Sequence, residues 1–318
     1  MKNILQVTGL RKRFLSRYGG CVVQAVNNVN LLVRRGETLG IVGESGCGKS
    51  TLGKAILRLI EPDAGTIIFD DEDVLSLDAR SLRAMRRDMQ MIFQDPYASL
   101  DPRMTIGAIV EEPLAIHGID SRAGRHEMML KLLETTGLER DAATRYPHEF
   151  SGGQRQRIGI ARALALRPKL IIADEPVSAL DVSIQSQILN LLLDLKEEFN
   201  LSYIFISHDL AVVEHVSDQV AVMYLGGIVE TAPAVELYAR PSHPYTEALI
   251  TAIPQADRGQ TGHRIVLKGE MPDPENPPAG CTFHPRCPKA MDICRMKSPT
   301  EKNIGSNGRD HLIRCHLY

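Results

Sequence analysis

The sequence feature that most constrains the fold is a glycine-rich turn between a short apolar run and a helical pattern. The run Thr38–Val42 is bounded by glycine, which is typical of a buried β-strand. It is followed by Gly43-Glu44-Ser45-Gly46-Cys47-Gly48-Lys49-Ser50-Thr51. The pattern over residues 52–59 then predicts a helix. A strand, a loop and a helix in this order favour an α/β domain with a mainly parallel sheet.

The turn over residues 43–51, called the phosphate loop below, has a spacing that suits a polyphosphate. Gly43 and Gly48 allow the backbone to wrap an anion with its N–H groups pointing inward, helped by the positive end of the helix. We expect Lys49 to reach the β and γ phosphates and the Ser50 hydroxyl to bind Mg²⁺. Composition alone produces such a spacing about once in a hundred chains of this length. A nucleotide site is therefore predicted here.

A second apolar run ends in two acids. Leu170-Ile171-Ile172-Ala173-Asp174-Glu175 predicts a buried parallel strand, and open α/β sheets bind ligands at the carboxyl ends of such strands. Asp174 is suited to hold Mg²⁺, and Glu175 to polarise an attacking water. Buried strands often end at a surface acid, so this pattern indicates nucleotide chemistry only together with the phosphate loop.

Another glycine-containing turn precedes a helix in the middle of the chain. Ser151-Gly152-Gly153-Gln154 forms a second candidate anion site at a helix N-terminus. One ATP needs a single such site for its triphosphate, so the second is explained if it closes on a nucleotide held by another subunit. A helix N-cap followed by a flexible turn is the simpler interpretation of these residues alone.

The remaining sequence divides into a helical middle and a distinct C-terminal part. Residues 96–167 are mostly helical in pattern, residues 183–199 form an amphipathic helix and residues 203–207 a strand. Prolines at 272, 274, 277 and 278 exclude a helix or a central strand over residues 271–280. We therefore expect a main domain over residues 1–240 and a smaller extension over residues 241–318.

Composition excludes several classes of protein. The 37 basic and 39 acidic residues give a net charge of −2 and no bias toward nucleic acid. Hydrophobic residues make up 43%, as in globular rather than disordered proteins. No apolar run approaches the roughly 18 residues that cross a bilayer, and the beginning of the sequence offers no signal-peptide core. We expect a soluble, cytoplasmic chain that reaches a membrane only through a partner.

Four of the six cysteines gather near the end of the sequence. They are Cys281, Cys287, Cys294 and Cys315, whereas Cys21 and Cys47 stand alone. In a reducing compartment such a group indicates a metal more often than disulfides, and four thiolates suit Zn²⁺ or an iron–sulfur cluster. No pair has the CxxC spacing of zinc fingers. Free or disulfide-bonded thiols are the alternative, and His284, His311 and His316 are either zinc ligands or ordinary surface histidines.

Together these motifs resemble those of ATP-binding-cassette (ABC) ATPases over about residues 4–240. The phosphate loop resembles the family's Walker A motif, residues 170–175 its Walker B strand and residues 151–154 its signature motif, with Phe150 where leucine is commoner. Gln94, in Phe93-Gln94-Asp95-Pro96, matches the Q-loop glutamine that contacts Mg²⁺ and the attacking water. Ser178-Ala179-Leu180-Asp181 resembles the D-loop, and His208 matches the switch histidine that contacts the γ-phosphate.

The resemblance implies both a fold and a mechanism. The fold is a P-loop α/β domain with a mainly parallel sheet core, an antiparallel β portion and a helical subdomain over about residues 96–167. Two such domains pair head to tail, so that each ATP lies between one subunit's phosphate loop and the Ser151 region of the other. ATP binding closes the dimer, and hydrolysis reopens it. The family also stacks an aromatic ring on adenine, for which Phe14 is the first candidate and Tyr18 the alternative.

Other stretches resemble the dipeptide and oligopeptide importer branch of this family. They are the extended Q-loop over residues 93–103, His243-Pro244-Tyr245-Thr246, Asn276-Pro277-Pro278-Ala279-Gly280-Cys281 and Phe283-His284-Pro285-Arg286-Cys287-Pro288. The branch implies an ATPase subunit at the cytoplasmic face of the inner membrane. Its partners would be a homologous ATPase subunit in a heterodimer or homodimer, two transmembrane permease subunits and an extracytoplasmic binding protein. In related importer ATPases the four-cysteine pattern resembles a [4Fe–4S] site.

The cargo and the class of ATPase have alternatives. The branch imports peptides, nickel, glutathione or some sugars, and peptides are our first expectation. A soluble ABC ATPase of DNA repair or translation usually carries long coiled-coil insertions or two tandem cassettes, whereas this chain has a single signature motif and near-neutral charge. A small-molecule kinase with the same phosphate loop would lack residues 151–154 and His208.

Overall fold

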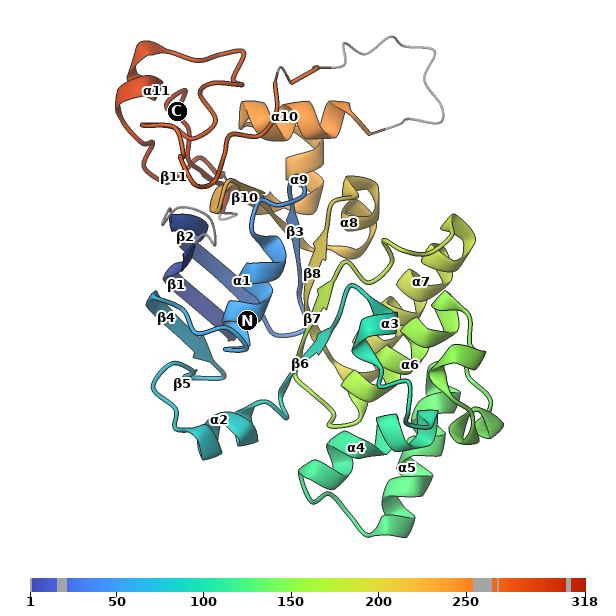
Figure 1. The fold of residues 1–318 in the computed structure, drawn as a ribbon. Helices are drawn as coiled ribbons and strands as arrows, with labels where there is room; N and C mark the ends of the chain where they lie inside the picture. The colour runs from blue at the N-terminus through green and yellow to red at the C-terminus, as the bar shows by residue number, and fades with distance from the viewer. Residues whose placement is uncertain (1, 16–21, 254–264, 268, 307–309) are drawn as a thin grey trace. The chain divides into compact units, whose positions relative to one another are not determined.

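The structure is a computed structural model of the 318-residue chain that describes residues 2–15, 22–253, 265–267, 269–306 and 310–318. Figure 1 shows the helices and strands, coloured along the chain from blue at the N-terminus to red at the C-terminus. The chain forms two compact units whose segments alternate along the sequence. Unit 1 contains the described residues among 1–4, 34–37 and 76–206, and unit 2 those among 5–33, 38–75 and 207–318. Each unit has its own strands, helices and buried apolar side chains.

The strands of unit 1 lie parallel, in the order β8-β7-β6. Their bounds are β6 Met89–Ile92, β7 Leu170–Asp174 and β8 Ser202–Ser207. Every residue of β7 and β8 is buried, because a parallel strand that is covered on both faces stays apolar along its length. The strands that the sequence predicts at residues 170–174 and 203–207 are confirmed, and β7 ends at Asp174.

Helices make up much of the rest of unit 1, as the sequence predicts for residues 96–167. They are α2 (Ala79–Met85), α3 (Pro96–Ser99), α4 (Ile106–Ile116), α5 (Arg122–Thr135), η1 (Arg140–Thr144), η2 (Pro147–Glu149), α6 (Gly152–Leu164) and α7 (Val182–Phe199). Buried side chains that include Ile109, Leu133 and Ile158 join α4, α5 and α6 in one core. Helix α7 ends at Phe199, as the pattern over residues 183–199 predicts, and Asn200 caps it in the left-handed conformation (φ 50°).

Unit 2 contains an antiparallel sheet in the order β2-β1-β4-β5. Its strands are β1 (Asn3–Leu15), β2 (Val22–Arg34), β4 (Ala64–Phe69) and β5 (Glu72–Asp73). Strands β1 and β2 have 13 residues each and extend well beyond the short apolar stretches Ile4–Leu5 and Val29–Val33 that they contain. Buried and exposed residues intermix along both strands, because an antiparallel sheet can leave one face in solvent and so accepts polar residues.

The other strands of unit 2 follow the order β3-β9-β10-β12-β11. They are β3 (Thr38–Val42), β9 (Gln219–Tyr224), β10 (Gly227–Pro233), β11 (Lys302–Asn303) and β12 (Leu312–Ile313). Strand β3 is fully buried and pairs in parallel with β9, whereas the later pairs are antiparallel. The end of the chain therefore joins this sheet through β12, beside β10. The helices of unit 2 are α1 (Lys49–Ile56), α8 (Leu210–Val216), α9 (Ala234–Ala239), α10 (Pro244–Thr251) and α11 (Asp292–Met296).

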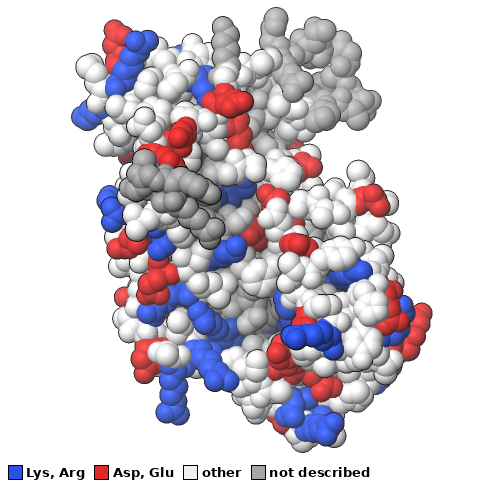
Figure 2. Space-filling model, viewed as in Figure 1, with Lys and Arg blue, Asp and Glu red and all other residues white. Residues whose placement is uncertain are grey.

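Two expectations from composition can be compared with the structure. No helix in the described part of the chain is long and apolar enough to cross a membrane. Residues 271–280 form neither helix nor strand, as their prolines predict. Figure 2 shows basic and acidic side chains on the same visible face, in keeping with the nearly balanced charge.

Candidate nucleotide-binding site

The phosphate loop lies in unit 2, between the buried strand β3 and helix α1. Gly43, Gly46 and Gly48 have positive φ angles of 155°, 80° and 108°. A Cβ at Gly43 would lie 2.2 Å from the carbonyl oxygen of Met223, and one at Gly48 would lie 2.0 Å from that of Ala25. Both positions therefore require glycine, for its backbone freedom and for the close approach of neighbouring backbone.

Lys49 lies inside this loop and is buried, with only 4% of its surface exposed. Its Nζ donates to the carbonyl oxygens of Gly43 (2.8 Å) and Glu44 (3.0 Å). A buried ammonium beside loop N–H groups and the start of a helix is a site for an anion. These donors fit the triphosphate of ATP, whose oxygens can take the place of the two carbonyl oxygens.

In unit 1, the expected catalytic carboxylate lies against the expected Q-loop glutamine. Gln94 Nε2 donates to Glu175 Oε2 over 2.9 Å. Glu175 has a φ of 47°, which a non-glycine residue rarely adopts, and its N–H donates to the Ile206 carbonyl oxygen over 2.9 Å. Such strain costs on the order of 1–3 kcal/mol and persists only where the surrounding structure holds it. The turn after β7 thus holds the backbone of Glu175 in place, and Asp174 before it is buried.

The turn of residues 151–154 begins helix α6 in unit 1. Ser151 Oγ accepts from the Gln154 N–H (3.4 Å), and Gln154 Oε1 accepts from the Ser151 N–H (3.0 Å). The simpler interpretation of this turn, a helix N-cap, is therefore present in the structure as a reciprocal capping box. Ser151 is also exposed, and a hydroxyl that accepts one hydrogen bond can still donate its proton. The cap leaves the serine able to meet an anion.

The expected D-loop lies next to this turn. A Cβ at Gly153 would lie 2.5 Å from Ile184 Cγ2 on α7, so the close packing of α6 on α7 needs glycine there. Ser178 Oγ donates to the Glu175 carbonyl oxygen over 3.1 Å. Asp181 is the exposed N-cap residue of α7, and its side chain makes no capping hydrogen bond. The D-loop acid therefore presents its carboxylate at the surface of unit 1.

The expected switch histidine and the first adenine-stacking candidate belong to unit 2. His208 follows β8 directly and is exposed. Phe14 lies near the end of β1 with 39% of its surface exposed, and Lys12 Nζ is 5.3 Å from its ring centre. An exposed ring at a strand end is available for stacking on a base. Tyr18, the alternative, lies outside the described residues.

Comparison with known proteins identifies the family. Residues 26–178 match the family described as ABC transporter, and residues 229–294 match that described as oligopeptide/dipeptide transporter, C-terminal region. The oligopeptide transport ATP-binding protein AppF of Bacillus subtilis is 52% identical over 325 residues, which cover 100% of this chain and 98% of AppF. The chain belongs to the ATP-binding subunits of oligopeptide and dipeptide ABC transporters. As a member of that family it is an ATPase.

Further similarities agree with this assignment. A probable peptide ABC transporter ATP-binding protein of Sinorhizobium fredii, y4tS, is 57% identical over 93% of this chain and 83% of y4tS. Among solved structures, a dimeric post-hydrolysis state of the ATP-binding cassette MJ0796 bound to ADP and phosphate has a TM-score of 0.66. It is 33% identical and covers 72% of this chain and 98% of its own. The expected ABC fold is therefore confirmed.

The expected Mg²⁺ ligands of this ATPase come from both units. Ser50 lies in the first turn of α1 in unit 2, whereas Gln94 and Asp174 lie in unit 1. Hydroxyl, amide and carboxylate oxygens are donors that suit a hard cation, and Mg²⁺ usually binds through one or two carboxylates together with substrate phosphates. Each of these side chains, taken by itself, is therefore of a type that suits a Mg²⁺ ion delivered with ATP.

The four C-terminal cysteines are free thiols in unit 2. Burial, together with the nearby thiols of Cys294, Cys315 and Cys287, raises the pKa of Cys281 to about 11. In the described residues, no group of three or more His, Cys, Asp or Glu side chains is placed to hold a metal ion. The described structure therefore gives no support to the expected [4Fe–4S] cluster or to zinc at these thiols.

One of the three nearby histidines differs from the expectation of a surface residue, whereas the other two are partly exposed. His284 Nδ1 lies 2.9 Å from the Cys281 carbonyl oxygen, and His316 Nε2 lies 2.8 Å from that of Lys297. His311 is 7% exposed, so a surface position is wrong for this residue. It is buried because it has a buried carboxylate as its partner.

That partner is Glu230 on β10, which is fully buried. Glu230 Oε1 lies 2.7 Å from His311 Nε2, and the carboxylate also accepts from the N–H groups of Ser242 and His243. Burial raises the pKa of Glu230, but its hydrogen bonds with His311, Ser242 and His243 lower this pKa by more than burial raises it, so the net change is downward. The carboxylate therefore joins β10, the start of α10 and the end of the chain.

A neutral histidine beside this carboxylate predicts a pH dependence of stability. Burial lowers the pKa of His243 to about 4, below its unfolded value of about 6.5, so acidification favours the unfolded chain. Between about pH 7.5 and 5.5, the wild type is expected to lose roughly 1 kcal/mol more unfolding free energy than His243→Asn. The asparagine cannot titrate but keeps an acceptor for the Tyr245 N–H, which lies 3.1 Å from His243 Nδ1. Urea unfolding at both pH values measures this, and identical losses would show that His243 is not held neutral.

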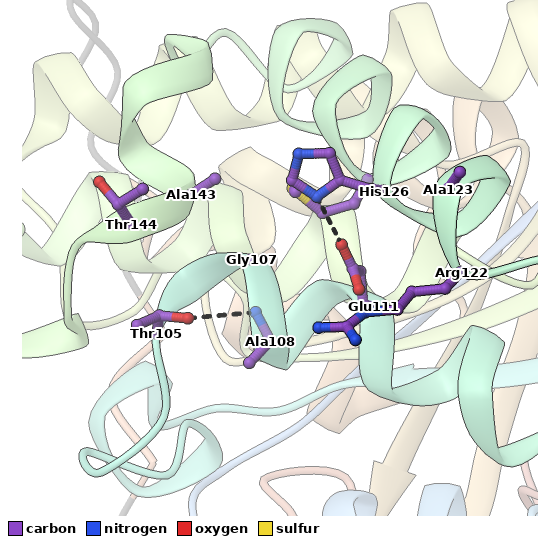
Figure 3. Close-up of a pocket in the computed structure, with 10 residues that line it drawn as sticks. Thr105, Gly107, Ala108, Glu111, Arg122, Ala123, His126, Ala143 and Thr144 are labelled. Carbon is purple, nitrogen blue, oxygen red and sulfur yellow. Dashed lines mark hydrogen bonds and ion pairs between the residues drawn. The ribbon is translucent and has the colours of Figure 1, made fainter.

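A pocket of about 610 Å³ lies among α4, α5 and η1 in unit 1 (Figure 3). On its wall, His126 Nδ1 lies 2.9 Å from Glu111 Oε1, and Arg122 lies beside this pair. None of the predicted ATP-site residues lines it. The pocket is therefore separate from the nucleotide-binding motifs of unit 1.

Proposed function

We propose that this ATPase energises the import of di- and oligopeptides through a membrane ABC transporter. The observation that carries the proposal is the phosphate loop with Lys49 buried inside it, where an anion can replace the loop's own carbonyl oxygens. The match of residues 229–294 to the oligopeptide/dipeptide transporter family supports peptides as the cargo. The names of AppF and y4tS support the same cargo.

Residues of the phosphate loop bind the nucleotide in this proposal. Lys49 and the loop N–H groups hold the β and γ phosphates, and Phe14 stacks on adenine. Ser50, Gln94 and Asp174 would hold Mg²⁺, which would supply positive charge to stabilise the negative charge of the triphosphate. The remaining residues between Gly43 and Thr51 shape the loop around the triphosphate.

Three side chains outside the loop carry the hydrolysis. Glu175 orients the attacking water toward the γ-phosphate, and its hydrogen bond to Gln94 supports this orientation before the water is bound. Gln94 then also contacts the water. His208 stabilises the charge that develops on the transferring phosphoryl group, together with Lys49.

A second ATPase domain completes each site. Ser151, Gly152, Gly153 and Gln154 of one subunit close on the ATP that the other subunit's phosphate loop holds, and Asp181 lies at the interface between them. The exposed positions of Ser151 and Asp181 support this role. ATP that binds the closed dimer more tightly than the open one shifts the population toward closure, and hydrolysis reverses the shift. The partner is a homologous chain in a heterodimer or a second copy in a homodimer.

The proposed assembly assigns the parts of the chain different tasks. Residues 1–240 form the ATPase domain, with the helical subdomain at about residues 96–167, and residues 241–318 form a C-terminal extension. The ATPase lies peripherally at the cytoplasmic face of the inner membrane. It works with two transmembrane permease subunits and an extracytoplasmic substrate-binding protein, and the Gln94 loop contacts the permeases.

The iron–sulfur assignment rests on the family resemblance alone. Four cysteines at residues 281, 287, 294 and 315 are the proposed ligands of a [4Fe–4S] cluster, with zinc as the alternative, and no step of ATP hydrolysis depends on them. Their placement in this structure does not favour a metal. Iron and acid-labile sulfide analysis of anaerobically purified protein decides between these assignments, and the absence of both removes the cluster.

A cargo panel tests the proposed function. Cells that lack this chain and cells with it restored are given labelled dipeptides, oligopeptides, nickel, glutathione and a sugar in separate experiments. We expect uptake of the peptides to depend on the chain and uptake of the other compounds to be unchanged, because the C-terminal region matches the peptide branch. A strain without other peptide uptake systems prevents masking. Peptide uptake that is equal in both strains, with loss of nickel, glutathione or sugar uptake, would contradict the peptide assignment.

A further inference from the structure

The C-terminal extension contacts the phosphate loop directly, within unit 2. Arg286 donates to both carboxylate oxygens of Glu44, from Nη1 to Oε2 over 2.7 Å and from Nη2 to Oε1 over 2.9 Å. The Arg286 side chain is 7% exposed and that of Glu44 is 30% exposed. A bidentate ion pair between a guanidinium and a carboxylate is stronger than a single contact, and this pair is largely shielded from water.

The extension also holds the backbone of Glu44. The Glu44 N–H donates to the hydroxyl oxygen of Tyr245 over 3.0 Å. Tyr245 is fully buried, and its ring centre lies 5.3 Å from that of Phe283 and 4.7 Å from that of Tyr224. These packed rings fix the hydroxyl in place. Both the side chain and the N–H of Glu44 are thus bound from outside the phosphate loop.

The fold of the cysteine-rich part of the extension positions the guanidinium. The Arg286 N–H donates to the Phe283 carbonyl oxygen (3.0 Å), and the Cys281 carbonyl oxygen accepts from the His284 N–H (3.0 Å). The Cys281 N–H donates to the Cys294 carbonyl oxygen over 2.8 Å. Arg286 therefore projects from a hydrogen-bonded turn whose geometry depends on the extension as a whole.

The charge of Glu44 matters because this residue belongs to the anion site. It follows Gly43, and its own carbonyl oxygen accepts from Lys49 Nζ. A free carboxylate at this position would oppose a polyphosphate by like-charge repulsion, and a fixed guanidinium removes most of that repulsion.

We propose that Arg286 is a positioning residue for ATP binding, which draws the Glu44 carboxylate to the C-terminal extension and neutralises it. The proposal rests on the proposed function, because it gives the extension control over ATP affinity at the same site. Arg286 acts only through Glu44. Removing the arginine therefore weakens ATP binding while the carboxylate is present and has little effect once the carboxylate is gone.

The test measures the dissociation constant of MgATP for the full chain and for matched variants. Arg286→Gln leaves Glu44 unpaired and is expected to raise the constant about tenfold. The double variant Glu44→Gln/Arg286→Gln carries neither charge, and its constant is expected within about threefold of that of the single variant Glu44→Gln. Lys289→Gln is the control, because it breaks another ion pair of the extension, with Glu247 at 2.7 Å, that does not involve the phosphate loop. Its constant is expected to equal that of wild type.

Two further readouts separate this role from a purely structural one. Raising the salt concentration from about 0.05 to 0.5 M shortens the range of electrostatic repulsion. It is therefore expected to reduce the increase in the MgATP dissociation constant that Arg286→Gln causes. In ATPase assays this variant is expected to raise KM more than it lowers kcat. If Arg286→Gln fails to fold, Arg286→Lys is the substitute, because lysine keeps the charge but cannot form the bidentate contact. Its dissociation constant for MgATP is expected to lie between that of wild type and the roughly tenfold higher value expected for Arg286→Gln.

Each result has one meaning. Equal constants for wild type and Arg286→Gln overturn the proposal. So does an Arg286→Gln substitution that raises the constant as much in the Glu44→Gln background as in wild type, because the arginine would then act without Glu44. A wild-type chain that binds no MgATP contradicts the proposed function instead, so the two failures are distinguishable.

Discussion

Replacing Lys49 by alanine is expected to lower the affinity for MgATP by at least about 100-fold, because charge-assisted hydrogen bonds to phosphate each contribute a few kcal/mol. Lys49 is 4% exposed and its Nζ already lies at hydrogen-bond distance from two carbonyl oxygens of the loop. The ammonium is thus held in place before ATP arrives and needs no long movement to meet the phosphates. Equilibrium binding of labelled ATP measures the loss.

Lys54→Ala is the matched control for this substitution. Lys54 lies in the last turn of the same helix, α1, outside the phosphate loop. Its replacement by alanine removes an equal charge without changing that loop. We expect its affinity for MgATP to stay close to that of wild type. An alanine at position 49 that binds MgATP as tightly as the control would contradict the assignment of residues 43–51 as the phosphate site.

Replacing Glu175 by glutamine is expected to lower ATP hydrolysis by about 10²- to 10⁴-fold, the usual contribution of a positioned general base. The glutamine has nearly the same shape and keeps an oxygen that can accept from Gln94 Nε2, which lies 2.9 Å from Glu175 Oε2. Geometry is therefore retained while the basic carboxylate is lost. ATP binding is expected to stay within a few-fold of wild type, because none of the proposed phosphate contacts comes from Glu175.

Glu197→Gln serves as the control for this variant. It removes an exposed carboxylate from α7 in the same unit, away from the turn after β7. Phosphate release at saturating ATP measures hydrolysis, and labelled ATP measures binding in the same preparations. Steady-state hydrolysis by Glu175→Gln close to that of the control would contradict the role of Glu175.

The elements that sequence predicts well are those whose local pattern reflects burial. Strands β3 and β7 appear as short apolar runs because both faces of a parallel strand are covered. Helix α7 shows its buried face through Ile188, Leu192 and Leu195, which recur at helical spacing. The glycines of the phosphate loop are predictable for a similar reason, since only glycine tolerates the positive φ and close backbone contact found there.

The contacts that local patterns do not predict join residues far apart in sequence. Arg286 and Glu44 are 242 positions apart, and the local sequence around each residue does not indicate its partner. His311 resembles a surface histidine until the fold brings it to the buried Glu230. Strand β11 has only two residues, both exposed, so it shows no alternation of apolar and polar residues from which it could be predicted. Each of these features depends on how the C-terminal extension packs in unit 2.

Phe14 and Ser151 show the difference between placing a residue and assigning its role. The position of Ser151 at the start of α6 can be predicted from the sequence, because Ser151 and Gln154 have the spacing of the capping box that they form. Its role toward a partner's ATP depends on a second subunit, so it remains a proposal. Phe14 is exposed at a strand end. Its contact with adenine depends on the bound nucleotide, so it also remains a proposal.

The most direct test of the central proposal, that ATP hydrolysis by this chain drives peptide import, is uptake of a labelled oligopeptide by cells whose only copy carries Glu175→Gln. Cells that carry Glu197→Gln at the same protein level are the comparison. Uptake is expected to be lost with Glu175→Gln and normal with Glu197→Gln. Normal uptake in both strains, in a background without a second peptide system, would contradict the account.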